Sequence, residues 1–170
     1  MIQQKTFDQV FKIMEKSFPT TEFRTYSAQK KLLTNPYYRL LTERNDNNEV
    51  IAFLCSWEFK FFRYIENIAV SSTIRGRGVG NKLMRRYIDQ SKLPIILEVE
   101  PPETELQQKR VRFYERLGFH LNSHHHIQPP LREGNPILHL NIMSHPELLT
   151  DSQYEKIRYT LFQEVYDFKC

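Results

Sequence analysis

The segment IRGRGVGNKLM, residues 74–84, has the residue types and spacing needed to hold a phosphate group. It contains three of the five glycines of the chain, at alternate positions: Gly76, Gly78 and Gly80. An apolar strand pattern precedes it and a helical pattern follows. The first N–H groups of a helix have no internal partner, and the helix dipole makes that end positive. Since glycine removes the Cβ that would hold a phosphate away, the segment predicts an anion site.

Two known glycine signatures do not fit this segment. A P-loop requires Lys and Ser/Thr after its last glycine, whereas Asn81 follows Gly80 here. A dinucleotide fingerprint requires Gly-x-Gly-x-x-Gly, whereas the spacing here is Gly-x-Gly-x-Gly. A third interpretation stays open at this point, namely a tight connection whose glycines serve packing alone.

The elements that must position this turn follow from the apolar periodicity. Strand, glycine turn, helix, strand, helix and strand follow one another from residue 64 to 122, after an antiparallel hairpin. We therefore expect one domain, residues 1–170, with an α/β (mixed α+β) fold: a mixed, mostly antiparallel sheet of about six to seven strands with helices on both faces. The expected helices are 6–18, 22–33, 79–88, 105–117 and 151–166, and the expected strands are 37–43, 50–59, 64–70, one within 93–101, 119–122 and 137–143.

Composition limits the function classes. The chain has 170 residues, a net charge of +4 and a pI of about 9.0, which suits an anionic ligand but lacks the dense basic stripe of a nucleic-acid binder. Cys55 lies in an apolar run and is expected in the core, and Cys170 is the last residue, so no disulfide framework is predicted. The first residues carry charges throughout, so we expect no signal peptide, no membrane span and a cytoplasmic location.

Several segments together resemble the GCN5-related N-acetyltransferases. Arg75, Gly78 and Gly80 match the acetyl-CoA signature of that family, Arg/Gln-x-x-Gly-x-Gly/Ala. YIENIAV resembles its fourth strand, and LEVE followed by RFYERLGF resembles its fifth strand and a helix ending in Tyr-x-x-x-Gly-Phe. These segments occur in the order of the family between residues 64 and 119. The resemblance implies a GNAT-like fold and an acyltransferase that moves an acetyl group from acetyl-CoA to a primary amine.

The resemblance also implies a set of residues that bind acetyl-CoA, with no metal. The backbone N–H groups of residues 77–81 would hold the pyrophosphate, and a bulge in the strand 64–70 would expose backbone groups to the pantetheine arm. Gln107 stands where the family often has an asparagine that contacts this arm, and would replace it. The expected cofactor-binding residues are Ile68, Ala69, Val70, Arg75, Gly76, Arg77, Gly78, Val79, Gly80, Asn81 and Gln107.

Three glutamates are candidates for the base. An amine of the lysine type has a pKa of ~10.4, so at neutral pH a carboxylate is the usual acceptor of its proton. Glu98 ranks first, because burial in an apolar strand should raise its pKa. Glu66 ranks second, since it could pair with Arg63, and Glu100 ranks third. The alternative for any of them is a structural ion pair, with Arg112 or another cation.

Tyr114 matches the tyrosine that protonates the thiolate of coenzyme A in many members of the family. The alternative is that Tyr114 is a helix residue that serves packing alone.

Three adjacent histidines, His124 to His126, make a poor metal site because neighbours on a strand point to opposite faces. Glu22 and Arg24 lie where the family forms one wall of the acceptor cleft, although solvated charges at a helix start are the simpler interpretation.

The acceptor is expected to be a small-molecule amine or a peptide amine, and the chain a monomer or homodimer that binds no nucleic acid and no membrane. One alternative stays open, namely a non-catalytic module that binds and senses acetyl-CoA. A module that binds nucleic acid or phosphate would need more clustered basic charge than this sequence has.

Overall fold

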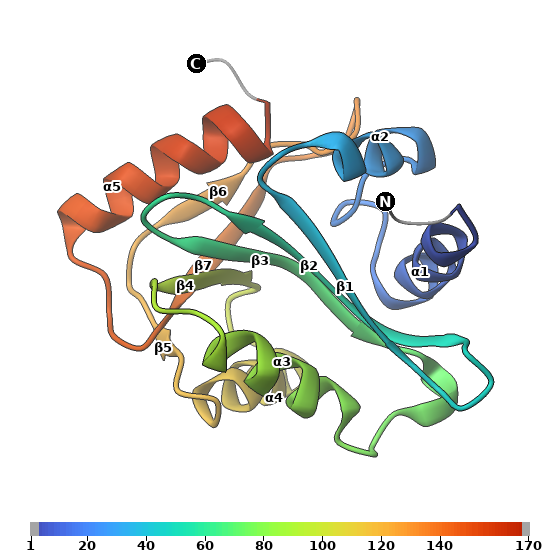
Figure 1. Cartoon of the computed structure of the whole chain (residues 1–170). Helices are drawn as coiled ribbons and strands as arrows, with labels where there is room; N and C mark the ends of the chain where they lie inside the picture. The colour runs from blue at the N-terminus through green and yellow to red at the C-terminus, as the bar shows by residue number, and fades with distance from the viewer. Residues whose placement is uncertain (1–3, 168–170) are drawn as a thin grey trace.

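The computed structural model describes residues 4–167 and contains a seven-stranded mixed sheet with helices on both faces (Figure 1). The strand order is β1-β2-β3-β4-β7-β5, and β6 pairs with the first three residues of β7, Leu138–Leu140. Only β3 and β4 run parallel, so the predicted mixed, mostly antiparallel sheet is confirmed. The strands are β1 (Tyr38–Arg44), β2 (Val50–Glu58), β3 (Arg63–Val70), β4 (Ile95–Val99), β5 (His120–Leu121), β6 (His126–Gln128) and β7 (Leu138–His145).

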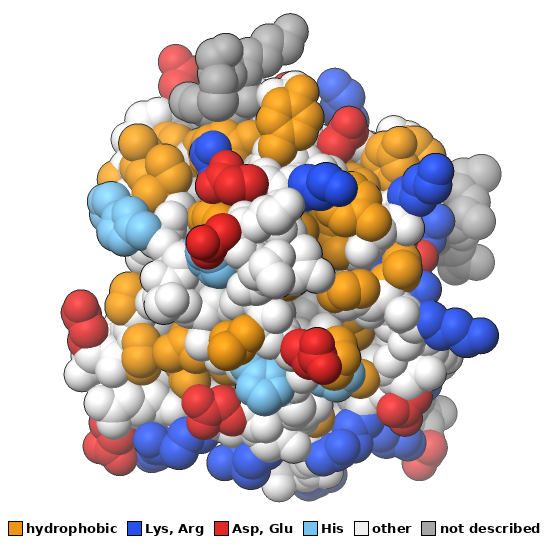
Figure 2. Space-filling model, turned by 90° about the vertical axis from the view of Figure 1, so that its left-hand side faces the viewer, with side chains coloured by type: hydrophobic (Ala, Val, Ile, Leu, Met, Phe, Trp, Pro, Cys, Tyr) orange, Lys and Arg blue, Asp and Glu red, His pale blue; other side chains and the backbone are white. Residues whose placement is uncertain are grey.

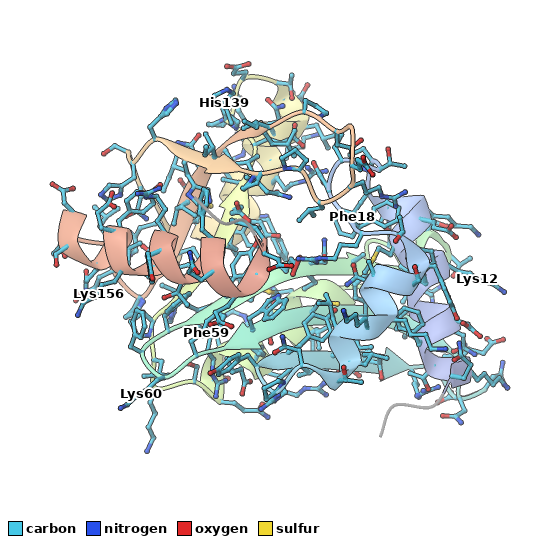
Figure 3. The ribbon with its side chains drawn as sticks, turned by 90° about the horizontal axis from the view of Figure 1, so that it is seen from above. Lys12, Phe18, Phe59, Lys60, His139 and Lys156 are labelled. Atoms are coloured by element: carbon cyan, nitrogen blue, oxygen red, sulfur yellow. The ribbon has the colours of Figure 1, made fainter. Side chains whose placement is uncertain are left out.

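Helices cover the two faces of this sheet in separate groups. The α-helices are α1 (Gln4–Ser17), α2 (Tyr26–Lys31), α3 (Val79–Asp89), α4 (Glu105–Glu115) and α5 (Asp151–Thr160). One core cluster joins one sheet face to α1, α5 and the π-helical turn η3 (Leu161–Val165), and a second joins the other face to α3 and α4. Figure 3, seen from above, shows α1 and α5 at opposite ends of the face that they share.

The helices α2, α4 and α5 begin where a threonine side chain supplies a cap. Thr104 and Thr150 form capping boxes with the glutamine three residues later, and so fix the starts of α4 and α5. Gly118 follows α4 with a φ of +94°, as expected for a glycine that ends a helix. These local signals explain why the predicted starts of α4 and α5 agree with the structure.

Two predicted helices have other boundaries, and one strand was missed. The second helix starts at Tyr26 rather than Glu22, because the Thr25 side chain accepts a hydrogen bond from Ala28 N and caps it there. Residues 126–128 form a strand, β6, which the run of histidines and prolines concealed. The predicted last helix is α-helical only to Thr160 and continues as η3.

Cys55 is 1 % exposed in β2, as predicted for a core residue, and burial raises the pKa of its thiol to about 12. Cys170 lies outside the described residues. Among the helices of residues 4–167, none is both long and apolar enough to cross a membrane. Figure 2 shows acidic and basic side chains interspersed over the face that it presents.

Candidate active site

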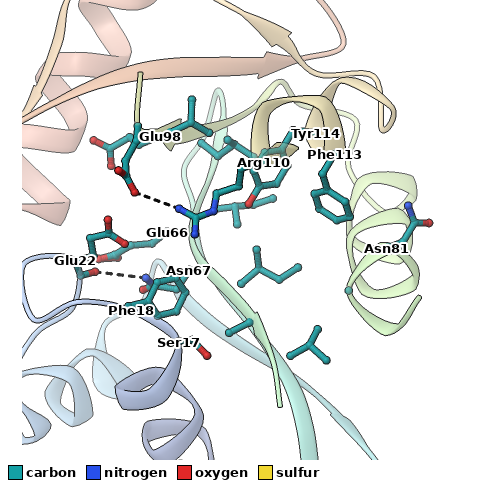
Figure 4. Close-up of a pocket in the computed structure, with 18 of the residues that line it drawn as sticks. Ser17, Phe18, Glu22, Glu66, Asn67, Asn81, Glu98, Arg110, Phe113 and Tyr114 are labelled. Carbon is teal, nitrogen blue, oxygen red and sulfur yellow. Dashed lines mark hydrogen bonds and ion pairs between the residues drawn. The ribbon is translucent and has the colours of Figure 1, made fainter. Parts of the chain in front are cut away.

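A cleft opens where the two parallel strands separate. β3 and β4 pair only between Arg63–Ile65 and Ile95–Leu97. Beyond this short ladder the strands diverge, and the edge of β3 from residue 66 to 70 faces a cavity of about 650 Å³. The cavity extends from the start of α3 to a group of carboxylates on β3, on β4 and after α1. Figure 4 shows Glu22, Glu66 and Glu98 on one side of it and Asn81 on the other.

The glycine turn forms the α3 end of this cavity. Gly76 and Gly78 have φ values of +86° and +74°, and a Cβ at either position would meet nothing within 4 Å. Backbone conformation therefore selects glycine at both positions. At Gly80 the reason is different, because a Cβ would lie 3.3 Å from Val70 Cγ2 and would crowd the contact between helix and strand.

The turn leaves backbone donors free. The first intrahelical bond of α3 runs from Lys82 N to Gly78 O, so within the described chain the N–H groups of residues 79–81 have no acceptor. They lie at the positive end of an 11-residue helix. Such a row of unpaired donors fits the pyrophosphate of coenzyme A.

Most of the predicted cofactor-binding residues line the cavity, and two do not. Those that line it are Ile68, Ala69, Val70, Arg75, Gly76, Gly78, Val79, Gly80 and Asn81. Arg77 is exposed outside it. Gln107 accepts from Thr104 N and donates to Glu100 Oε2 at 2.8 Å, because its place in the first turn of α4 makes it part of the capping box. Leu106 and Arg110 face the cavity from α4 instead.

Glu98 lies in the cavity wall, and the predicted direction of its pKa was wrong. Burial by itself would raise the pKa of Glu98, but hydrogen bonds and charge from His126, and hydrogen bonds from Tyr166 and Tyr64, outweigh burial and lower it. The carboxylate is therefore held in its ionised form. Its partners come from β6, from β3 and from the end of η3.

Glu66 is the extra residue of a β-bulge. Cys55 pairs with Asn67 and Ser56 with Ile65, so Glu66 has no opposite residue on β2. Its carboxylate forms an ion pair with Arg24 and accepts a hydrogen bond from Trp57 Nε1 at 2.6 Å.

Two sequence interpretations are corrected by this arrangement. Arg63 pairs with Glu58 and not with Glu66. Arg24, interpreted as a solvated charge, is only 7 % exposed, because its second guanidinium nitrogen donates to Val165 O at 2.8 Å.

The two remaining carboxylates of the cleft differ in their partners. Glu100 forms an ion pair with Arg110 at 3.2 Å. The sequence had suggested Arg112 or another cation as the partner in such a pair, and here the partner is Arg110. Within residues 4–167 the Glu22 carboxylate has no hydrogen-bond or ion-pair partner. Burial raises the pKa of Glu22, and the negative charges of Glu100 and Glu98 add to this shift.

Tyr114 lines the cavity between the two ends, and its hydroxyl has no hydrogen-bond partner within the described residues. Burial raises its pKa to about 12, so the hydroxyl keeps its proton at neutral pH. Asn67, which the sequence did not single out, is 5 % exposed, and its Oδ1 atom is a buried acceptor without a partner among residues 4–167. An N–H group of a bound molecule would satisfy it.

The histidine run forms no metal site in the described residues. The His124 ring forms a hydrogen bond with the Asp151 carboxylate, and the His125 side chain is exposed. His126 is fully buried and contacts the Glu98 carboxylate. The exposed His125 and the buried His126 agree with the expectation that neighbouring histidines point to opposite faces. The proximity of His126 to Glu98 was not predicted, because no local signal links residues 28 positions apart.

Comparison with known proteins identifies the family. The family model described as "Acetyltransferase (GNAT) family" matches residues 6–119. A solved structure described as "Putative acetyltransferase from GNAT family from Bacteroides thetaiotaomicron" is 30 % identical, with a TM-score of 0.87 over 96 % of this chain and 93 % of that one. The Bacillus subtilis (strain 168) protein "Putative acetyltransferase YjbC" is 36 % identical over 89 residues, which cover 47 % of this chain and 44 % of that protein.

A more distant structure shows the shared fold. An aminoglycoside 6'-N-acetyltransferase complexed with coenzyme A is 14 % identical, with a TM-score of 0.58 over 81 % of this chain and 88 % of that one. The chain belongs to the GNAT family of acetyltransferases and is an acyltransferase. The resemblance found in the sequence is therefore confirmed, and the family uses acetyl-CoA.

Proposed function

We propose that the protein transfers an acetyl group from acetyl-CoA to a primary amine of a cationic acceptor. The observation that carries this proposal is the continuity of the cleft, which joins the unpaired N–H groups of α3 to a group of carboxylates. An acyl donor bound at one end would place its reactive group near an amine bound at the other.

The backbone supplies most of the binding for the donor. The N–H groups of residues 79–81 hold the pyrophosphate, and Arg75 adds charge beside them. The free edge of β3 from Ile68 to Val70 pairs with the amide groups of the pantetheine arm, since β4 has already diverged there. When bound, acetyl-CoA supplies an acetyl group activated as a thioester.

Carboxylates bind and orient the acceptor. Glu22, Glu66, Glu98 and Glu100 all line the same cavity. Glu66 and Glu100 are neutralised by Arg24 and Arg110, and Glu98 contacts His126. Glu22, which has no ion-pair partner within residues 4–167, is the carboxylate that attracts an ammonium group. An acceptor with positive charge is therefore favoured over an anionic one.

Proton transfer uses two of these side chains. Glu98 accepts a proton from the amine, directly or through a water molecule, and the neutral nitrogen is then a nucleophile. Tyr114 donates its hydroxyl proton toward the sulfur on which negative charge develops. Glu66 ranks below Glu98 as a base, because it forms a buried ion pair with Arg24 that ties the bulge of β3 to the segment after α1.

Release of free thiol from acetyl-CoA with a panel of amines tests the proposal. Polyamines, aminoglycosides, amino acids and peptides with free N-termini would form the panel, with matched N-acetylated or carboxylated compounds as controls. We expect turnover with cationic amines and little with the controls. Binding of acetyl-CoA without turnover of any amine would contradict the proposal and favour a binding module.

A further inference from the structure

The Glu98 carboxylate is almost fully occupied by donors from the protein. Oε2 accepts from the Tyr166 hydroxyl at 2.7 Å and contacts His126 Nε2 at 2.8 Å, while Oε1 accepts from the Tyr64 hydroxyl. Burial and the Glu98 charge raise the pKa values of Tyr64 and Tyr166 well above their ordinary value, so both hydroxyls remain donors. A carboxylate offers about four lone-pair positions. Three are filled, and the one on Oε1 is left for a ligand.

A second contact fixes the other ring nitrogen of His126. Nδ1 lies 2.9 Å from the Tyr154 hydroxyl, which in turn donates to His125 O at 3.1 Å. The Tyr154 hydroxyl has a single proton. Because the Tyr154 hydroxyl donates that proton to the His125 carbonyl, it can only accept a hydrogen bond from His126. Nδ1 must therefore carry a proton of its own.

We propose that His126 is a positioning residue, held doubly protonated by Glu98 and Tyr154, that fixes Glu98 as a carboxylate with one lone pair directed to the acceptor amine. With Glu98 ionised, only this proton arrangement satisfies all the hydrogen bonds of the network together. With a single proton on His126, either Nδ1 loses its partner or the His125 carbonyl loses its donor. The inference rests on the proposed function, in which Glu98 faces the amine.

No other cation of the described residues contacts Glu98. Arg24 is held by Glu66, and Arg110 by Glu100. The remaining titratable and charged groups around the pair are Tyr64 and Glu66 on β3, Glu100 after β4, Glu22 after α1, Tyr154, Glu155 and Arg158 on α5, and Tyr166 after η3. Since Arg24 and Arg110 are held by other carboxylates, the counter-charge to Glu98 falls to His126.

The test is the pH dependence of kcat/KM with a reactive amine. In His126→Gln the amide can still donate to Glu98 Oε2, but the positive charge is lost. Glu98 then binds its proton more tightly, so the acidic limb of the profile should move to higher pH. Tyr154→Phe removes the acceptor of the Nδ1 proton and should move the limb in the same direction by a smaller amount.

His125→Gln is the matched control. It makes the same change one residue away, where the ring is exposed and does not contact Glu98, and it should leave the profile unchanged. Equal folding of the three variants is checked by their melting temperatures. An unmoved acidic limb in both His126→Gln and Tyr154→Phe would assign the network a structural role and overturn the proposal. A limb that moves to lower pH would make His126 a base and would overturn it too.

A second measurement does not depend on turnover. The ¹⁵N signals of the His126 ring, assigned by their loss in His126→Gln, report how many protons the ring holds. We expect two protons at neutral pH in the unmodified chain and one in Tyr154→Phe. A ring with one proton in both proteins would overturn the proposal, whereas an amine panel without turnover would overturn only the proposed function.

Discussion

Arg24 and Glu66 form an ion pair in which the side chains are only 9 % and 5 % exposed, although 42 residues separate them in the chain. Burial by itself lowers the pKa of Arg24, but the adjacent carboxylate outweighs burial and raises it. The pair joins the segment after α1 to the bulge of β3. We therefore expect Glu66 to serve the architecture of the cleft, whereas the proposed function assigns proton transfer to Glu98 on the neighbouring strand.

Glu66→Gln should lower stability more than it alters the pH profile. The substitution leaves the buried Arg24 without its counter-charge, and breaking one partner of a buried pair typically costs about 3–5 kcal/mol. Chemical denaturation measures this change in the free energy of unfolding. Glu98→Gln is the comparison, since it should depress the rate and erase the acidic limb of kcat/KM. If Glu66→Gln loses that limb and Glu98→Gln keeps it, their roles are reversed.

Gly78→Val should abolish binding of acetyl-CoA. A β-branched residue is strained at a φ of +74°, and a shift of the turn misaligns the free N–H groups of α3. In the unmodified chain, acetyl-CoA at 100 times its dissociation constant adds roughly 2.7 kcal/mol of stability, which a thermal shift detects. Gly134→Val is the control, because Gly134 has a φ of +83° in a loop away from the cavity. Equal loss of the shift in both variants would remove the special role of the turn.

Tyr114→Phe should lower kcat by ~10²-fold with little change in acetyl-CoA affinity. The ring keeps its packing against Phe119, and only the hydroxyl that faces the cavity is lost. Because its pKa of about 12 lies above the working range, this tyrosine should not produce an alkaline limb near neutrality. Tyr87→Phe is the control, since burial raises the pKa of Tyr87 to about 12 as well but Tyr87 lies outside the cavity lining. Full turnover in Tyr114→Phe would make this residue structural.

Glu22→Gln should stabilise the free protein and weaken binding of the amine. The raised pKa of Glu22 means that the folded state binds its proton more tightly than the unfolded state, so Glu22 lowers stability as the pH rises through that pKa. The melting temperature of the variant should therefore exceed that of the unmodified chain at neutral pH, and the difference should vanish in acid.

The KM for a cationic amine should rise about tenfold in Glu22→Gln, as expected for one lost charge-assisted hydrogen bond. Glu103→Gln, at an exposed acid after β4, should change neither quantity. An unchanged KM together with a raised melting temperature would show that Glu22 does not contact the acceptor.

The sequence by itself determined the parts of this protein that depend on neighbouring residues. Alternation and helical periodicity located the hairpin, β3, α3, β4 and α4, because each pattern repeats within one element. Three glycines between a strand and a helix predicted the anion site, since both the left-handed conformation and the free N–H groups arise locally. Family motifs then placed Glu98 and Tyr114 in the same cleft.

Only the tertiary structure decided how the carboxylates differ. The partner of Glu66 comes from the segment after α1, and the partners of Glu98 come from β3, β6 and the end of the chain that follows η3. These contacts lower the pKa of Glu98, which burial was expected to raise. They also bury Arg24, which the sequence suggested was solvated. A pKa depends on every charge and donor within a few ångströms, and folding brings those groups together across up to 68 positions of sequence.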